Sequence, residues 1–117
     1  MADHRHSETS EKALERYLVD RAHEYGARAL KYFNANNSGY PDRLLVFKGG
    51  YVCWCELKSL GDRPRPLQSY RISVLREMGH HVYVVDSKEK IDRMLAKEDR
   101  EAQSRWKALK ALKREES

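Results

Sequence analysis

The 117-residue sequence contains few cysteines and no long apolar run, and both features narrow the class of protein to which it can belong. No apolar run approaches the ~20 residues that a membrane-spanning helix requires. The first ten residues, MADHRHSETS, contain no apolar segment of the kind that a secretory signal needs. The two cysteines, Cys53 and Cys55, lie so close together on one predicted strand that a disulfide is not expected. We therefore expect a cytoplasmic protein whose cysteines pack in the core.

Common DNA-binding modules are also missing. The sequence contains no zinc-finger spacing, no basic zipper and no recognisable recognition helix. The formal net charge is nevertheless +5 and the isoelectric point is near 9.3, which favours a polyanionic partner, with nucleic acid first among them. A basic protein with a charged helical tail would show the same balance, so charge alone does not decide between the two.

The spacing of apolar residues and of helix-breaking residues predicts the architecture. Ser10 is suited to cap a first helix that begins at Glu11, and Gly26 is suited to end this helix. The predicted strands cover residues 27–33, 43–48, 51–58 and 81–86. We expect an α/β domain with the element order α-β-β-β-α-β-α, in which helices flank a mixed sheet.

The C-terminal part of the chain is predicted to be mostly helical. A helix begins at Pro66 and ends at Gly79, and its apolar positions are Leu67, Tyr70, Ile72, Val74, Leu75 and Met78. No Gly or Pro follows Gly79, so residues 88–116 are expected to form a helix, with a break near Lys97. The charged segment after the break fits either a solvated helix or a contact with a partner.

The segment GYPDRLLVFKGGYVCWCELKS, residues 39–59, reads as two strands around Gly49-Gly50, but it carries charges where apolar alternation should continue. Both faces of the second strand begin apolar, so this strand is expected to be central, and burying Glu56 there is costly unless the charge is paired or bound to a metal. A plain two-residue turn would set Asp42 opposite Leu57. We predict a bulge or a three-residue loop that places Asp42 opposite Glu56 or Lys58 instead, or else an irregular start of the first strand at Pro41-Asp42.

Two interpretations explain these charges. Lys58 could form a structural ion pair with Glu56 or Asp42, which would account for an isolated E-x-K. Two carboxylates that meet across a hairpin repel each other and raise a pKa, whereas a divalent cation between them removes the conflict, and oxygen ligands favour Mg²⁺ or Mn²⁺. Such a set suits metal-assisted phosphodiester hydrolysis, with Lys58 holding the attacking water or stabilising charge on the phosphate.

A known family shows the same ordered set of residues. Glu11, GYPDR at 39–43, CELK at 55–58 and Gln68 together resemble the virus-type replication-repair nuclease domain, VRR-NUC. This family is a branch of the PD-(D/E)XK, or restriction-endonuclease-like, superfamily. The resemblance implies an α-β-β-β-α-β core, with a C-terminal helical extension outside the pattern. It divides the chain into a disordered lead at 1–9, a nuclease domain at 10–96 and a charged helical tail at 97–117.

The resemblance also implies roles for individual residues at the hairpin. Asp42 and Glu56 match the acids that bind Mg²⁺ or Mn²⁺, and the backbone carbonyl of Leu57 is an expected further ligand. Lys58 matches the catalytic lysine.

Two more positions match residues that the family carries on helices. Glu11 matches the helix-borne acid, which could contact the metal through water, although Glu15 lies one turn further on the same face. Gln68 matches the helix glutamine, which is expected near the site.

The function implied by the resemblance is that of a metal-dependent DNA endonuclease. A short, stand-alone chain resembles the phage-type members, which are similar to Holliday junction resolvases acting as homodimers. We expect double-stranded or branched DNA as the substrate, cut at junctions, flaps or ends during replication, recombination or repair of phage or mobile-element DNA. A phage-encoded protein would act in the host cytoplasm. The alternatives are a noncatalytic nucleic-acid-binding module with the same fold and a structural or assembly protein.

Basic residues around the expected site are candidates for contacts with the DNA backbone. Such contacts position DNA without reading its sequence, so a preference for DNA shape is expected. The candidates are Arg43, Arg63, Arg65, Arg71 and Lys48.

Overall fold

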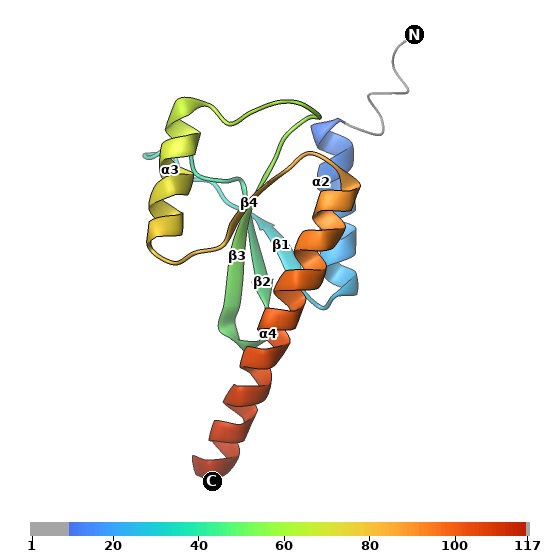
Figure 1. The fold of residues 1–117 in the computed structure, drawn as a ribbon, viewed down its shortest axis with the longest axis vertical. Coiled ribbons are helices and arrows are strands. Elements are labelled where there is room, and N and C mark those ends of the chain that lie inside the picture. Colours follow the sequence, from blue (N-terminus) through green and yellow to red (C-terminus); the bar gives the residue numbers. More distant parts are fainter. Residues whose placement is uncertain (1–9, 117) are drawn as a thin grey trace.

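The computed structural model describes residues 10–116, so the predicted N-terminal lead lies outside the described residues. Helices and strands follow in the predicted order (Figure 1). Their bounds are α2 (Glu11–Glu24), β1 (Arg28–Lys31), β2 (Arg43–Phe47), β3 (Tyr51–Leu57), α3 (Pro66–Glu77), β4 (Val82–Val85) and α4 (Lys88–Glu116). In this part of the chain no helix is both long and apolar enough to cross a membrane.

The four strands form one mixed sheet in the order β1-β2-β3-β4. β2 is antiparallel to both of its neighbours, and β3 is parallel to β4. Helices α2 and α4 pack on one face of the sheet and α3 on the other (Figure 1). These observations confirm the mixed sheet flanked by helices, the central position of β3 and the C-terminal helix. The fold is α/β and restriction-endonuclease-like.

The first helix has the predicted ends. The Ser10 hydroxyl accepts a hydrogen bond from the Ala13 backbone N–H at 3.2 Å, which satisfies one of the unpaired amides of the first turn. Gly26 follows the last turn with a φ of +78°, a conformation that glycine adopts without strain. Leu14 and Leu18 are fully buried, and they form the side of the helix that packs on the sheet.

Alternation along β3 sets the two faces of the sheet. Cys53 and Cys55 are free, fully buried thiols on the side of α2 and α4, where they pack as small apolar residues. Trp54 points to the other side, where α3 contributes Ile72 and Leu75 to a smaller cluster. Core packing of both cysteines is confirmed.

The predicted apolar stripe of α3 is only partly buried. Ile72 and Leu75 contact the sheet, whereas Leu67, Tyr70 and Met78 are exposed. The reason is that α3 covers little of the sheet beyond the β4 edge, so a single narrow side of the helix finds a partner.

The predicted break near Lys97 is wrong. Helix α4 runs without interruption for 29 residues, because the face that carries Ile91 and Leu95 continues into buried Glu98 and Ala102. The helix extends along the sheet and beyond the end of the hairpin (Figure 1). The proposed division of the chain at residue 97 stays a prediction, but it does not coincide with the end of a helix.

A buried carboxylate that sequence patterns did not predict joins α4 to the sheet. Glu98 is fully buried and accepts hydrogen bonds from the hydroxyls of Tyr51 on β3 and Tyr83 on β4. The Nδ1 atom of His81 lies 3.0 and 3.1 Å from its two oxygens. Burial opposes the ionisation of Glu98, but these hydrogen bonds outweigh that effect and hold its pKa below the ordinary value.

Replacing this carboxylate should destabilise the fold. We expect Glu98→Ala to lower the free energy of unfolding by about 3 kcal/mol, because it removes the fully buried acceptor that the Tyr51 and Tyr83 hydroxyls share. Urea denaturation at neutral pH would measure the change. Glu101→Ala, at an exposed position of the same helix, is the matched control and should change stability by less than about 0.5 kcal/mol. Equal effects of the two substitutions would contradict the structural role of Glu98.

Candidate active site

The turn of the β2–β3 hairpin sets the register of the site. Phe47 pairs with Tyr51 and Arg43 pairs with Cys55, so the connection has three residues, Lys48–Gly50. Both glycines of this turn have positive φ angles, +82° for Gly49 and +68° for Gly50. The next pair in this register is Asp42 and Glu56, which confirms the predicted offset.

The two acids meet at the end of the hairpin far from the turn. The Asp42 backbone N–H donates a hydrogen bond to Glu56 Oε1 at 3.1 Å. Lys58 lies on the same face of the chain, with its Nζ 3.3 Å from Glu56 Oε2. The acid, the second acid and the lysine therefore converge, as the hairpin pattern predicted.

Neither carboxylate is fully compensated by its surroundings. Burial raises the pKa of Glu56, the charge of Asp42 raises it further, and Lys58 only partly opposes the shift. Burial also raises the pKa of Asp42, against a lowering effect of Arg43. The Oδ1 atom of Asp42 is buried without a hydrogen-bond partner. Both acids, and not one as the sequence suggested, are thus held in an environment that disfavours their charged forms.

The backbone of Leu57 also faces this point. The backbone N–H groups of Trp54 and Lys58 donate to the carbonyls of His81, just before β4, and of Val85 in β4. Because successive strand residues direct their peptide groups to opposite sides, the peptide groups of Leu57 face β2. The Leu57 amide accordingly interacts with the Asp42 carboxylate. Because N–H and C=O of one strand residue point to the same side, the Leu57 carbonyl is directed toward the same edge.

These groups fit a hard divalent cation. An unpartnered buried carboxylate oxygen, a second carboxylate and a nearby backbone carbonyl offer oxygen atoms alone, which is the donor set that Mg²⁺ and Mn²⁺ prefer. Among residues 10–116, no three or more His, Cys, Asp or Glu side chains are grouped so that they could hold a metal ion together. A cation held by Asp42 and Glu56 would therefore take its other ligands from the backbone, from water or from the substrate.

The helix-borne acid that reaches this region is Glu15. Its Oε2 lies 2.6 Å from Arg43 Nη2 and 3.3 Å from Lys31 Nζ, and its charge contributes to the raised pKa of Asp42. Glu11 is exposed in the first turn of α2. The structure therefore brings Glu15 toward the two acids and does not bring Glu11 there, whose role stays a prediction.

Two of the predicted DNA contacts are placed elsewhere. Arg43 is only 8% exposed, and its guanidinium donates to Glu15 and to the Ala29 carbonyl, because alternation along β2 turns this side chain inward. Lys48 lies in the hairpin turn, at the opposite end of β3 from Glu56. Neither residue lies beside the two acids, so the prediction that they surround the mouth of this site is wrong.

The remaining predicted residues surround Lys58. A pocket of about 290 Å³, here called the mouth pocket, opens above it, lined by Ser38, Gly39, Tyr40, Lys58, Arg65, Leu67 and Gln68. The Oε1 atom of Gln68 is buried and lacks a hydrogen-bond partner, so Gln68 lies near the site as predicted. Arg63 is exposed in the loop that also carries Arg65.

Arg71 holds one wall of the mouth pocket. Its Nε donates to the Ser38 carbonyl at 3.1 Å, and its guanidinium lies 4.9 Å from the centre of the Tyr40 ring. Tyr40 in turn stacks with Trp54 at 6.4 Å, and Tyr32 meets Trp54 edge-on at 5.1 Å. The loop before Asp42 is thus fixed to α3 and β3 by an aromatic and cationic cluster.

Comparisons with known proteins identify a nuclease and a nuclease domain as similar. No model of a known protein family matches the chain. Among curated proteins, the chain is 33% identical over 79 residues to "Putative nuclease p44" of Acyrthosiphon pisum secondary endosymbiont phage 1, over 68% of this chain and 85% of that protein. Among solved structures it is similar to a "VRR_NUC domain", with 27% identity and a TM-score of 0.71, over 75% of this chain and 96% of the other.

The electrostatic repulsion between the two acids should lower the stability of the folded protein even without a metal. We expect Asp42→Asn to raise the free energy of unfolding in EDTA at pH 7, because it removes a carboxylate whose charged form is disfavoured in the folded state. The pKa of Asp42 lies above its usual 3.8 in the folded protein, so the difference should vanish near pH 3 and grow as the pH rises. Urea titrations at several pH values would measure it.

The exposed Asp20 on α2 provides the control, since Asp20→Asn should change stability by less than about 0.5 kcal/mol over the same pH range. An Asp42→Asn protein that is less stable than the wild type at pH 7 in EDTA would show that the carboxylate is stabilised by its surroundings.

Proposed function

The chain belongs to the VRR-NUC family of nucleases, and from that premise we propose that it is a Mg²⁺- or Mn²⁺-dependent DNA endonuclease. The observation that carries the proposal is the convergence of Asp42, Glu56 and Lys58, with a buried carboxylate oxygen that no protein group satisfies. A noncatalytic binding module would have no use for two repelling acids at this position.

Each residue has a role that follows from its position. Asp42 and Glu56, with the Leu57 carbonyl, would hold the cation, which when bound polarises the scissile phosphate and makes water a better nucleophile. Lys58, whose Nζ is held 3.3 Å from Glu56, would donate hydrogen bonds to the attacking water or to a phosphate oxygen as negative charge grows there. Glu15, anchored by Arg43, adds negative charge that favours a cation at the same place.

The mouth pocket supports a substrate that presents its phosphate backbone. Arg65 lines the pocket beside Lys58 and Gln68, and Arg63 is exposed nearby in the same loop. These contacts position a nucleic acid without reading its bases. We propose DNA, recognised by junctions, flaps or ends, as the substrate.

Assembly as a homodimer belongs to the same proposal. A junction resolvase makes two symmetric cuts, which two copies related by a two-fold axis can supply. Light scattering on the purified chain measures its mass directly, and a monomer at high concentration would exclude the resolvase version.

Catalysis should fail when any of the three converging side chains is neutralised. We expect Asp42→Asn, Glu56→Gln and Lys58→Ala each to lower the cutting rate by at least about a hundredfold, because each removes a cation ligand or a donor to the phosphate. The assay incubates supercoiled plasmid and four-way junction DNA with Mg²⁺, Mn²⁺ or EDTA.

Asp20→Asn and Lys12→Ala, at exposed positions of α2, are controls of the same chemistry and should cut normally. If none of the DNA substrates is cut with either metal while the protein still binds them, the binding module is the correct reading.

Cation binding can be tested separately from cutting. Mg²⁺ or Mn²⁺ at ten times its Kd should stabilise the wild-type protein by about 1.4 kcal/mol, since only the folded chain brings the two acids together. Differential scanning fluorimetry would record the rise in Tm, with NaCl of matched ionic strength as the reference. Asp42→Asn should abolish the response, and an equal rise in that variant would place the cation elsewhere.

A further inference from the structure

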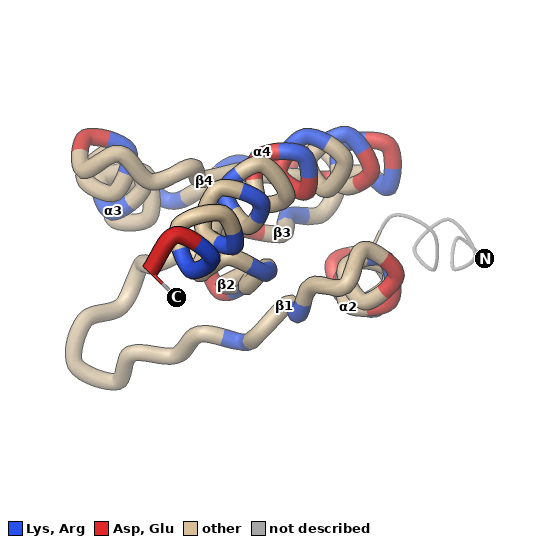
Figure 2. Tube along the Cα trace, turned by 90° about the horizontal axis from the view of Figure 1, so that it is seen from below, with Lys and Arg blue, Asp and Glu red and all other residues tan. Residues whose placement is uncertain are grey.

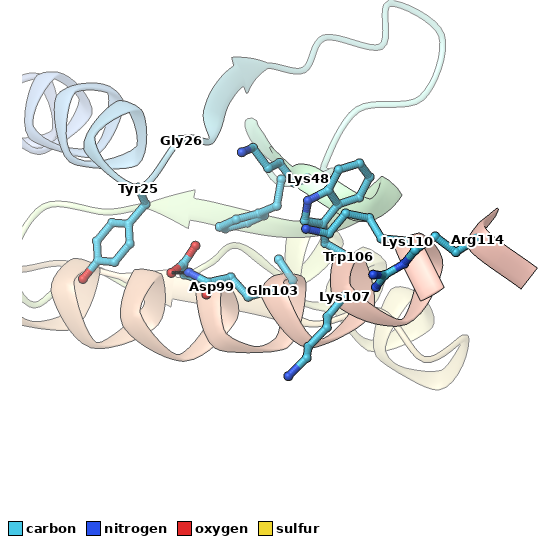
Figure 3. A pocket seen from close by; sticks show the side chains of 11 residues that line it. Tyr25, Gly26, Lys48, Asp99, Gln103, Trp106, Lys107, Lys110 and Arg114 are labelled. Atoms are coloured by element: carbon cyan, nitrogen blue, oxygen red, sulfur yellow. Dashed lines mark hydrogen bonds between the residues drawn. The ribbon is translucent and has the colours of Figure 1, made fainter. Parts of the chain in front are cut away.

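A second basic surface lies at the other end of the hairpin from the acids. Here α4 passes the turn between β2 and β3 and leaves a groove of about 590 Å³, which we call the hairpin-end groove. Lys48, Trp106, Lys107, Lys110 and Arg114 are among its lining residues (Figure 3). None of these residues belongs to the site built on Asp42 and Glu56.

The groove is a built part of the fold. Arg105 Nε donates to the Gly49 carbonyl at 2.7 Å, which fixes α4 to the hairpin turn. A Cβ atom at Gly49 would lie 3.1 Å from the Trp106 backbone nitrogen, so the helix approaches the turn as closely as a glycine allows. The groove walls are therefore held in place before any ligand arrives.

The charge of this end of the molecule is one-sided. Residues 102–114, AQSRWKALKALKR, contain five basic and no acidic residues, although acids are frequent before and after them. Figure 2 looks at the molecule from this end and shows these Lys and Arg positions on the last turns of α4 in front of the sheet. Asp99, the one acid lining the groove, accepts a hydrogen bond from Gln103 at 2.7 Å.

The aromatic residue in the groove is placed among these cations. Trp106 is partly exposed, and Lys110 Nζ lies 5.6 Å from the centre of its ring. An aromatic face between lysines is the combination that nucleic-acid grooves use, with cations on the phosphates and the ring against a base or sugar. A plain solvated helix end requires neither the ring nor the absence of acids.

We propose that the hairpin-end groove is a second nucleic-acid contact that holds the sugar–phosphate backbone of the DNA flanking the cut site. β3 runs from the turn to Glu56, and its seven residues span about 20 Å. That distance corresponds to about six base pairs of B-DNA. The groove lies on the α2/α4 side of the sheet and the mouth pocket on the α3 side, so a DNA molecule that contacts both must pass around the sheet. The inference rests on the proposed function only in taking DNA as the substrate.

The test measures DNA binding without cutting. Full-length protein in EDTA is titrated into fluorescein-labelled four-way junction and duplex DNA, and anisotropy gives the Kd at several salt concentrations. Lys107→Ala/Lys110→Ala should weaken binding on the order of tenfold near 0.1 M salt. The slope of log K against log salt should become shallower by about 2, one for each lost phosphate contact.

The matched control neutralises two cations on another side of the same helix. Arg93 and Lys97 line a separate hollow beside β4, and Arg93→Ala/Lys97→Ala should leave the Kd within about twofold and the slope unchanged. Circular dichroism confirms folding, which exposed Lys→Ala changes in a helix do not oppose.

Equal Kd values and salt slopes for the two double variants would overturn the inference. So would a Lys107→Ala/Lys110→Ala protein that changes its mass in sedimentation but not its DNA affinity, since the groove would then contact a second copy of the chain. Because no cation is present, loss of this contact is separable from a failure of the catalytic proposal, which leaves binding in EDTA intact.

Discussion

The repulsion between Asp42 and Glu56 is the constraint on which the rest of this structure depends. The charge of the half-buried Asp42 carboxylate raises the pKa of the buried Glu56 carboxylate, and the fold accepts that cost because β3 is central and is paired with a strand on each side. Lys58 compensates for part of the charge and Arg43 for another part. The charge that is left uncompensated is the charge that the proposed cation would neutralise.

Much of this site follows from local chemistry that a sequence displays. Tandem glycines, an acid after Pro41 and E-x-K at the end of an apolar strand are enough to predict the shifted register, because alternation gives each residue only two possible faces. Ser10 and Gly26 mark the ends of the first helix for equally local reasons. The family likeness then adds Gln68, whose approach to Lys58 depends on a loop of no regular pattern.

The features that the sequence did not reveal are those made by distant partners. Glu98 sits in a charged stretch and looks solvated, yet two tyrosines and a histidine from other elements enclose it. Arg43 follows an acid in the sequence and was predicted to contact phosphate, but its position on the strand directs its side chain toward Glu15 on α2. In both cases the residue type was read correctly and its burial was not, since burial depends on contacts that span 15 to 47 positions of the chain.

The close approach of α4 to the hairpin turn links two ends of the molecule that share no chemistry. Gly49 allows the Trp106 backbone to approach closely, and Arg105 donates a hydrogen bond to the Gly49 carbonyl. Contacts with α4 therefore fix the geometry of the three-residue turn. A slip of this turn by one residue would rotate Asp42 away from Glu56. Selection should consequently constrain positions 49 and 105 as strongly as active-site residues. Sequence variation in α4 should be tolerated only in the turns that no longer contact the hairpin.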